Sequence, residues 1–300
     1  MQALQQSKQQ LQQQAQQYWV KTIDGEQLFA QSFGDASKPA MVLVHGYPDN
    51  QEVWDLMIPH LLNDFYVISY DVRGAGRSTI PKKVSSYRLP QLSKDLNAVV
   101  EQVIPNRQFH LAAHDWGSIQ TWESVTEESF RGKILSYSTI SGPCLDHAQH
   151  YLQKAKTEQP LNALKMLSKS WYIAVFHLPL LAPTYWRVSS VNQWQKFLNN
   201  LEKAKGLPVS QAVLQDGQHG IALYRANFIP TMLKPRKRYA QCPVQAIVLR
   251  RDRFASPEYI DEVQHWADDF SRVEVDANHW AILSQPQRIA QYIADFALKY

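Results

Sequence analysis

The sequence lacks the features that mark several large classes of protein. Its two cysteines, Cys144 and Cys242, are too few for a disulfide framework and do not have the spacing of a metal site. No apolar run approaches the ~20 residues that a membrane-spanning helix needs. The net charge of +4 is modest, and no nucleic-acid-binding motif accompanies it. These absences favour a cytoplasmic protein that has no metal site, no membrane span and no nucleic-acid partner.

Two stretches have a biased composition. Residues 1–17 are rich in glutamine and lack the apolar core of a secretory signal, so we expect a surface-lying helix or disorder. Leu4, Leu11 and Ala15 would share one face of that helix. The densest basic run is Lys234–Arg238. A proline interrupts it and no amphipathic helix carries it, so we expect a solvated surface loop.

Short apolar runs alternate with segments of helical spacing in most of the chain. This alternation predicts an α/β protein with a mostly parallel sheet and helices on both faces. Asp24-Gly25, between the first two strands, is a favoured two-residue hairpin turn. The predicted strands are 18–23, 27–33, 40–44, 65–70, 109–113, 133–140, 244–249 and 272–275, and the helices between them are 54–62, 89–103, 119–125, 257–270 and 286–299.

The alternation stops between residues 144 and 230. This stretch is rich in Trp, Tyr, Leu and Pro, and it shows helical spacing without clear strands, at 161–181, 191–202, 210–215 and 221–228. We therefore expect a helical cap, residues 144–230, inserted after the sixth strand of a core. The core would comprise residues 18–143 and 231–300. The aromatic content of the cap predicts an apolar pocket between cap and core.

The stretch from Ala113 to Gly117 has the frame of a nucleophile elbow, a sharp turn between a strand and a helix that lifts one side chain above the sheet. Small residues flank the lifted position because the turn folds back tightly. The lifted residue is Asp115. An aspartate can attack carbon without first losing a proton, which points to a covalent ester with the substrate. The alternative is that Asp115 only caps the following helix.

Further ionisable side chains follow the later strands. In open parallel sheets the working residues lie at the carboxyl ends of the strands. Asp115, Asp252 and His279 follow three strands in the order nucleophile, acid and base. Asp276 is a second candidate for the acid, although its nearness to His279 in sequence favours a role in a turn. The alternative for His279 is a core histidine whose hydrogen bonds are satisfied.

Over nearly all of its length the chain resembles the α/β-hydrolase family, and within it the epoxide hydrolases, with the haloalkane dehalogenases next. The motifs that carry this resemblance are His45-Gly-Tyr-Pro48, Asp71-x-Arg-Gly-x-Gly-x-Ser78, His114-Asp-Trp-Gly117 and Asn278-His-Trp280. The chain departs from the family pattern at Ala113, where many relatives have glycine. It departs again at Arg250-Arg251 before Asp252, where glycine is common nearby.

The resemblance implies an enzyme that opens an epoxide to a vicinal diol. Asp115 would attack an epoxide carbon, and His279 would activate the water that hydrolyses the resulting ester. Asp252 would hold His279 in the right tautomer. The backbone N–H groups of Tyr47 and Trp116 would form the oxyanion hole. The partners implied are a small apolar epoxide and water, without a metal or organic cofactor.

The resemblance also assigns roles in the cap and the pocket. Tyr172 and Tyr224 lie in segments similar to those that carry the two proton-donating tyrosines of epoxide hydrolases. The alternative is that both rings only pack within amphipathic helices. We expect His45 and His114 to be structural neighbours of the site that hold loops by hydrogen bonds. The residues expected around the substrate pocket are His45, Pro48, Trp54 and Trp280.

Two other functions fit parts of the pattern. A haloalkane dehalogenase shares the aspartate nucleophile and the tryptophan that follows it. That family usually has asparagine in the corner where this chain has Tyr47, so a second halide donor is missing. The third possibility is a non-catalytic α/β-hydrolase scaffold that binds an apolar ligand. The complete set of Asp115, Asp252 and His279 argues against it.

Overall fold

The computed structural model describes residues 8, 10–169 and 171–300. They contain an eight-stranded sheet with the strand order β1-β2-β4-β3-β5-β6-β7-β8. β2 pairs antiparallel with β1 and β4, and the other neighbours are parallel. This confirms the predicted, mostly parallel sheet. The strands are β1 (Gln16–Lys21), β2 (Gln27–Phe33), β3 (Ala40–Val44), β4 (Tyr66–Tyr70), β5 (Phe109–His114), β6 (Ile134–Ile140), β7 (Val244–Leu249) and β8 (Phe270–Val275).

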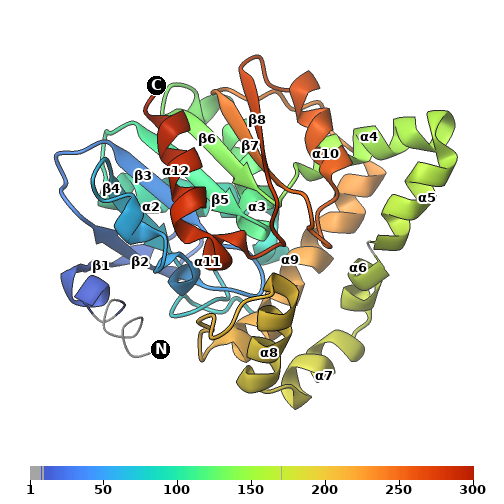
Figure 1. Cartoon of the computed structure of the whole chain (residues 1–300), viewed down its shortest axis with the longest axis horizontal. Coiled ribbons are helices and arrows are strands. Elements are labelled where there is room, and N and C mark those ends of the chain that lie inside the picture. Colours follow the sequence, from blue (N-terminus) through green and yellow to red (C-terminus); the bar gives the residue numbers. More distant parts are fainter. Residues whose placement is uncertain (1–7, 9, 170) are drawn as a thin grey trace.

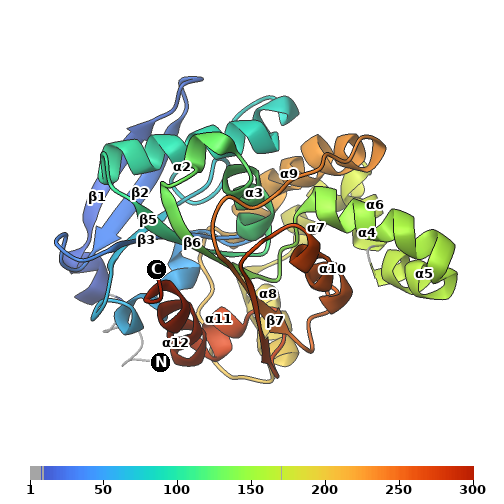
Figure 2. The ribbon, with the colours of Figure 1, turned by 90° about the horizontal axis from the view of Figure 1, so that it is seen from above.

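Apolar side chains cover both faces of the sheet because the central strands are buried on both sides. In β3, Met41 and Leu43 join one core cluster, while Val42 and Val44 join the cluster on the opposite face. Helices α2 (Leu89–Val103) and α3 (Trp116–Val125) cover one face. Helices α11 (Ala281–Ser284) and α12 (Pro286–Ala297) cover the other, as Figure 2 shows from above. The core is therefore a three-layer sandwich.

The chain reverses its direction of progress across the sheet between β3 and β5. β4 lies on one side of β3, and β5 with the strands that follow it lies on the other. Loops that leave the carboxyl ends of two such strands diverge and leave a crevice between them. The loop after β3 carries Tyr47, and the turn after β5 carries Asp115. The topology therefore brings two of the predicted site residues together.

The insertion between β6 and β7 is helical, as predicted, but its helices differ from those expected. The predicted helix 161–181 is broken, and Pro179 lies in the break because it has no N–H to donate and disfavours a helical conformation before it. The expected helices 210–215 and 221–228 are joined in one helix, which begins only at Val213. The helices of the insertion are α4 (Leu145–Glu158), α5 (Pro160–Lys169), α6 (Trp171–His177), α7 (Leu181–Val188), α8 (Val191–Glu202) and α9 (Val213–Leu233) (Figure 1).

Helix α9 contains two glycines, which weaken the helical signal in the sequence but allow close packing. A Cβ on Gly217 would lie 2.4 Å from the ring of Trp186, and one on Gly220 would lie 2.5 Å from the ring of Tyr47. The glycines therefore let α9 approach the aromatic rings of α7 and of the core. The Tyr47 hydroxyl donates to the Gly217 carbonyl at 2.9 Å and accepts from Trp186 Nε1 at 2.6 Å. These bonds join the insertion to the core beside the crevice.

Two predicted helices and one predicted turn of the core differ from the structure. The expected helix 54–62 is replaced by two 3₁₀ turns, η1 (Gln51–Trp54) and η2 (Ile58–His60), the second with a proline near its start. The expected helix 257–270 ends early, as α10 (Pro257–Asp261) followed by η5 (Glu262–His265). The loop of the first hairpin is longer than two residues, since Lys21 pairs with Gln27.

The glutamine-rich start is described in part. Residues 10–14 are helical, and Leu11 and Ala15 pack against the core cluster that contains α12. The Lys8 ammonium lies 2.6 Å from Glu52 and 3.1 Å from Asp55. Leu4 lies outside the described residues. Among the described residues, no helix is long and apolar enough to cross a membrane.

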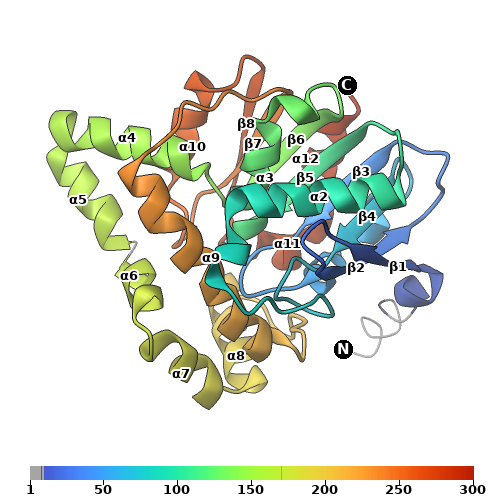
Figure 3. The same cartoon turned by 180° about the vertical axis from the view of Figure 1, so that it is seen from behind.

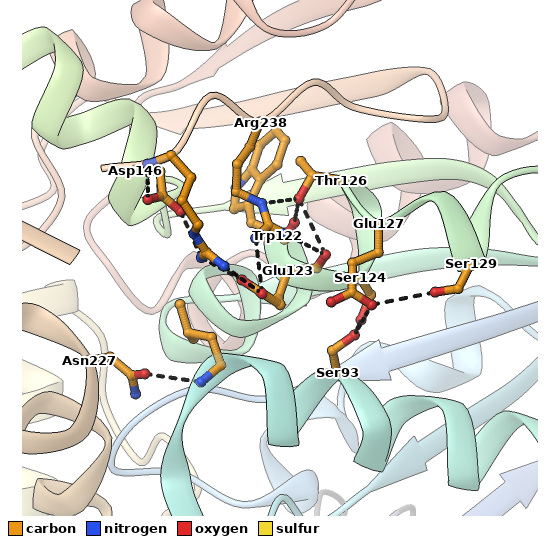
Figure 4. A network of polar contacts seen from close by, with 12 residues as sticks. Ser93, Trp122, Glu123, Ser124, Thr126, Glu127, Ser129, Asp146, Asn227 and Arg238 are labelled. Carbon is orange, nitrogen blue, oxygen red and sulfur yellow. Dashed lines mark hydrogen bonds and ion pairs between the residues drawn. The ribbon is translucent and has the colours of Figure 1, made fainter. Parts of the chain in front are cut away.

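The basic run Lys234–Arg238 lies in a surface loop, as its composition suggested, with Lys234, Arg236 and Lys237 exposed, but two of its arginines also bind buried acids. Arg238 donates to the Glu123 carboxylate at 2.9 Å and to the Thr126 hydroxyl at 2.6 Å (Figure 4). Arg236 makes a two-pronged pair with Glu123, at 2.9 and 2.8 Å, and an ion pair with Asp146. Both carboxylates are buried, so they need these cations. The run therefore fastens the end of the insertion to α3.

This network predicts a stability effect. Glu123→Gln should lower the free energy of unfolding by about 1–3 kcal/mol, because two guanidinium groups lose their shared carboxylate. Urea unfolding measures the change. Glu128→Gln is the control, since Glu128 pairs with Arg131 on the surface with both side chains about two-thirds exposed, and it should change nothing measurable. Equal midpoints for the two variants would contradict the role given to Glu123.

Candidate active site

Asp115 stands at a strained corner between β5 and α3. Its φ of +51° and ψ of −123° are unusual for a residue with a side chain, and that side chain makes no capping bond to the helix. The corner is too tight for bulk. A Cβ on Gly117 would lie 2.1 Å from the Val44 carbonyl oxygen, and one on Gly46 would lie 2.5 Å from Asp115 Cβ. The carboxylate is thus held above the sheet and free of the cap role that was its alternative.

The three predicted triad residues meet at the carboxyl ends of three strands. His279 Nδ1 lies 2.9 Å from Asp252 Oδ2, and His279 Nε2 lies 3.5 Å from Asp115 Oδ2. Asp252 Oδ1 also accepts the backbone N–H groups of Phe254 and Ala255, at 2.7 and 3.1 Å. Asp252 is therefore fixed by three donors, and one imidazole joins two carboxylates.

The alternative acid, Asp276, is not part of this arrangement. Its side chain is 63% exposed and pairs with Arg251 at 3.1 Å. The Asp252 side chain is 2% exposed. The geometry therefore favours Asp252 as the partner of His279, in agreement with the order of residues along the chain.

The imidazole is held as a cation. Burial by itself lowers the pKa of His279, but the charge of Asp252 and contacts with Asp115 and Asp252 outweigh burial and raise it to about 10. For Asp252, burial raises the pKa, and the nearby His279 outweighs this and lowers it below its usual value. At neutral pH the imidazole is therefore protonated on both ring nitrogens.

The loop after β3 supplies a hydrogen-bond donor to the Asp115 carboxylate. The backbone N–H of Tyr47 donates to Asp115 Oδ1 at 2.7 Å, and the bond between Tyr47 and Pro48 is cis. Trp116 is the first residue of α3, so its N–H is among those that the helix leaves unpaired at its start. The two oxygens of Asp115 thus have different surroundings: Oδ1 faces the Tyr47 N–H and Oδ2 faces His279.

A cavity of about 460 Å³ opens beside Asp115. Tyr172 of α6 and Tyr224 of α9 line it together with Asp115, and the two rings lie 6.3 Å apart. Burial, with a smaller contribution from Asp115, raises the pKa of both hydroxyls above the usual value for tyrosine. Both are neutral donors at physiological pH. The rest of the lining is mostly apolar and includes Trp116, Ile119, Phe228 and Phe254.

The four residues expected around the pocket lie elsewhere, and this part of the prediction needs correction. His45 does not line the cavity but holds a neighbouring loop, as also expected, since its Nε2 accepts the Val72 N–H at 2.9 Å. Trp54, the last residue of η1, is fully buried in the core, and Pro48 is buried at the cis bond and does not line the cavity. Trp280 packs edge-on against His279 at 4.6 Å, behind the imidazole. These residues support the site from the core side, whereas the wall of the cavity is shared between other core residues, such as Trp116 and Phe254, and residues of the insertion, such as Tyr172 and Tyr224.

Two neighbours of the triad had no signal in the sequence. Asp49 accepts a hydrogen bond from Trp280 Nε1 at 2.8 Å, and burial raises its pKa to about 7. Phe254 lines the cavity and meets the His279 ring at 4.9 Å. His114, as expected, makes a structural bond: its Nε2 lies 2.9 Å from the His279 carbonyl. An alternation of strands and helices does not predict which side chains surround an imidazole.

Comparison with known proteins gives a consistent result. Residues 39–286 match the profile of the alpha/beta hydrolase fold family. A probable oxidoreductase, EphD, of Mycobacterium tuberculosis is 30% identical over 93% of this chain and 49% of its own length. The chain thus spans about half the length of the first curated relatives it matches. Epoxide hydrolase 3 of Xenopus tropicalis is 23% identical over 88% of this chain and 72% of its own.

Solved structures share the fold. A variant of an epoxide hydrolase from Bacillus megaterium, complexed with its diol product, superimposes with a TM-score of 0.77. It is 21% identical, and the match covers 94% of this chain and all of that one. A Vigna radiata epoxide hydrolase variant also gives 0.77, at 20% identity over 96% of this chain and all of its own.

The raised pKa of His279 links stability to pH. A pKa near 6.5 in the unfolded chain and about 10 in the folded one means that this stabilisation is full below pH 6.5 and is lost as pH rises through 10. The advantage of the wild type over His279→Gln in free energy of unfolding should therefore shrink by more than about 1 kcal/mol across this range, in urea titrations. His60→Gln, at an exposed histidine, is the control. A constant difference between wild type and His279→Gln would mean that His279 is not held as a cation.

Proposed function

The chain belongs to the α/β-hydrolase fold family, and on this premise we propose that it is an epoxide hydrolase that works through a covalent ester on Asp115. One observation carries the proposal: a carboxylate at a nucleophile elbow faces an imidazole on one side and two cap tyrosines across an apolar cavity. An aspartate in this position attacks carbon directly. Relatives named epoxide hydrolase add support. In this proposal residues 144–230 act as the lid.

The first step opens the ring. Asp115 Oδ2 attacks an epoxide carbon, the bond from that carbon to the ring oxygen breaks, and its electron pair passes to the oxygen. Tyr172 and Tyr224 line the cavity with Asp115, and their hydroxyls donate to the developing alkoxide. Neutral tyrosines suit this task because a strongly basic oxygen appears only as the ring opens. A tyrosine hydroxyl gives its proton to the alkoxide. That tyrosine then regains a proton from the His279 cation, which becomes neutral.

Ester formation prepares His279 for the second step. In the resting site, the charges of Asp252 and Asp115 both raise the pKa of the imidazole. Once Asp115 is an uncharged ester, one of these charges is gone, and the pKa of His279 falls. The neutral imidazole then takes a proton from water, which attacks the ester carbonyl. Asp252 stabilises the cation that forms again.

The Tyr47 N–H serves the hydrolytic step. It already donates to Asp115 Oδ1, the oxygen that becomes the oxyanion when water adds to the ester carbon. The Trp116 N–H, at the start of α3, is proposed as the second donor. Collapse of the intermediate releases the diol and restores the Asp115 carboxylate and the His279 cation. The sum of both steps is one epoxide and one water consumed for each diol.

The covalent intermediate can be trapped. His279→Gln keeps the nucleophile and the tyrosines but removes the base, so the ester should form with styrene oxide and persist. Mass spectrometry of digested protein should find the substrate's mass added to the peptide that contains Asp115. Asp115→Asn with the same substrate is the control and should remain unmodified. An unmodified Asp115 in His279→Gln, with a substrate that the wild type turns over, would exclude the mechanism.

Two activity assays on the wild-type protein separate the rival functions. The wild type should produce a diol from styrene oxide and release no halide from bromobutane. Halide release without diol would identify a dehalogenase. Neither activity, together with a tightly bound apolar ligand, would favour the non-catalytic scaffold.

The two tyrosines should act as partly redundant donors. Tyr172→Phe and Tyr224→Phe should each lower kcat by about 10- to 100-fold, and the double variant by at least about 10³-fold, as expected for lost general acid catalysis. KM should change little, because the lost hydrogen bond strengthens only as charge develops. Tyr259→Phe is the matched control, since Tyr259 also lines the cavity and has no proposed role. Unchanged kcat in the double variant would show that the rings only pack.

A further inference from the structure

The outer surface of the insertion is unusually apolar. Leu161, Trp171, Leu180, Val188 and Leu233 have between 68 and 84% of their surface exposed. They lie on α5, α6, α7 and α9 and in the turn between α6 and α7. Helices α5, α6 and α7 form the edge of the molecule that is farthest from the sheet (Figures 1 and 3). Scattered apolar residues are normal on a surface, but such a concentration marks an interaction site.

Part of this surface continues into the lining of the cavity. On α6 and just after it, Trp171, Ala174 and Leu178 follow the three- and four-residue spacing of one helix face, and Ala174 lines the cavity. On α9, Ile229 and Met232 also line the cavity while they are 53 and 43% exposed.

Arg225 holds these two stretches together. Its guanidinium donates to the carbonyls of Phe176 and Leu178, both at 2.8 Å, one turn before Ile229. We call the set Trp171, Leu178, Leu180, Ile229, Met232 and Leu233 the apolar rim.

The insertion around the rim is positively charged. Residues 144–230 contain nine Lys and Arg against four Asp and Glu, a net charge of +5, whereas the whole chain carries +4. Asp146 and Asp216 are buried, and Glu202 is held by Trp280 and Ser284. Glu158 is the one exposed acid among these four. Among the side chains of the insertion that the structure describes, the exposed cations are Lys154, Lys156, Arg187, Lys196, Lys203 and Lys205, against this single exposed acid.

We propose that the apolar rim docks on an anionic lipid bilayer, so that the cavity opens into the membrane surface. Exposed leucine and tryptophan are side chains that enter the boundary between headgroups and acyl chains. The exposed lysines of the insertion and Arg187, which is next to Val188 in the chain, are attracted to anionic headgroups. A second copy of the chain fits less well, because a two-fold interface would place one cationic insertion against another.

The proposal gives the site a substrate class. It rests on the proposed function only here: an epoxide that is dissolved in the bilayer, with a long apolar body, would pass from lipid into the cavity without crossing water. The apolar residues that line the cavity from the rim to Asp115 match such a body. Docking itself does not depend on catalysis.

Vesicle flotation tests the docking. The probe is phosphatidylcholine vesicles with roughly one third phosphatidylglycerol. The wild-type protein should float with them, bind pure phosphatidylcholine vesicles more weakly, and lose affinity as salt is raised. Leu180→Glu with Leu233→Glu should weaken binding at least about tenfold, since two apolar contacts are replaced by repelled charges. Neither residue lines the cavity.

The control is Ile23→Glu with Leu298→Glu, which makes the same change in net charge at exposed apolar positions of the core. It should bind vesicles as the wild type does. Asp115→Ala should also bind normally, so failure of the enzymatic proposal and failure of docking give different results. The docking proposal is overturned if the wild type does not float or if both double variants bind equally. A third outcome also overturns it: the wild type runs as a dimer in size-exclusion chromatography, the variant with Leu180→Glu and Leu233→Glu runs as a monomer, and neither protein floats with vesicles.

Discussion

The arrangement of the site depends on one imidazole that lies between two buried carboxylates. His279 reaches Asp252 with one ring nitrogen and faces Asp115 with the other. A lone buried carboxylate is costly, and a cation shared by two is stabilised by both. The order of the strands in the sheet makes this sharing possible, because β5, β7 and β8 end at the same edge. The strained corner at Asp115 completes the arrangement by turning its carboxylate toward His279.

The charge balance of this trio also gives the proposed reaction its order. A cationic imidazole cannot act as a base, and the cation persists as long as Asp115 keeps its charge. Conversion of Asp115 to an ester removes that charge and with it part of the reason for the raised pKa. The base would therefore become active only after the covalent bond has formed. A single electrostatic coupling then separates ring opening from hydrolysis.

The insertion depends on the core in a different way. Tyr47 contributes its backbone N–H to Asp115 and its hydroxyl to Gly217 of α9. One residue thus joins the proposed oxyanion site to the helix that carries Tyr224. Two glycines of α9 allow the close approach, and the ion pairs of Glu123 fasten the far end of the insertion. The position of the cap tyrosines relative to Asp115 is consequently set by contacts with the core.

The sequence by itself determined the features that depend on short-range patterns. Apolar runs located the eight strands, small residues around Asp115 predicted the corner, and the order of polar residues after the strands predicted Asp252 and His279. Tertiary structure alone decided the rest. It showed that the cavity is lined by residues of both the insertion and the core, including Phe254, and not by Trp54 or Trp280. It also showed that Arg236 and Arg238 are bound to buried acids and that Asp49 supports Trp280. These outcomes depend on contacts between residues far apart in the chain, and no local pattern encodes which distant side chain will be nearest.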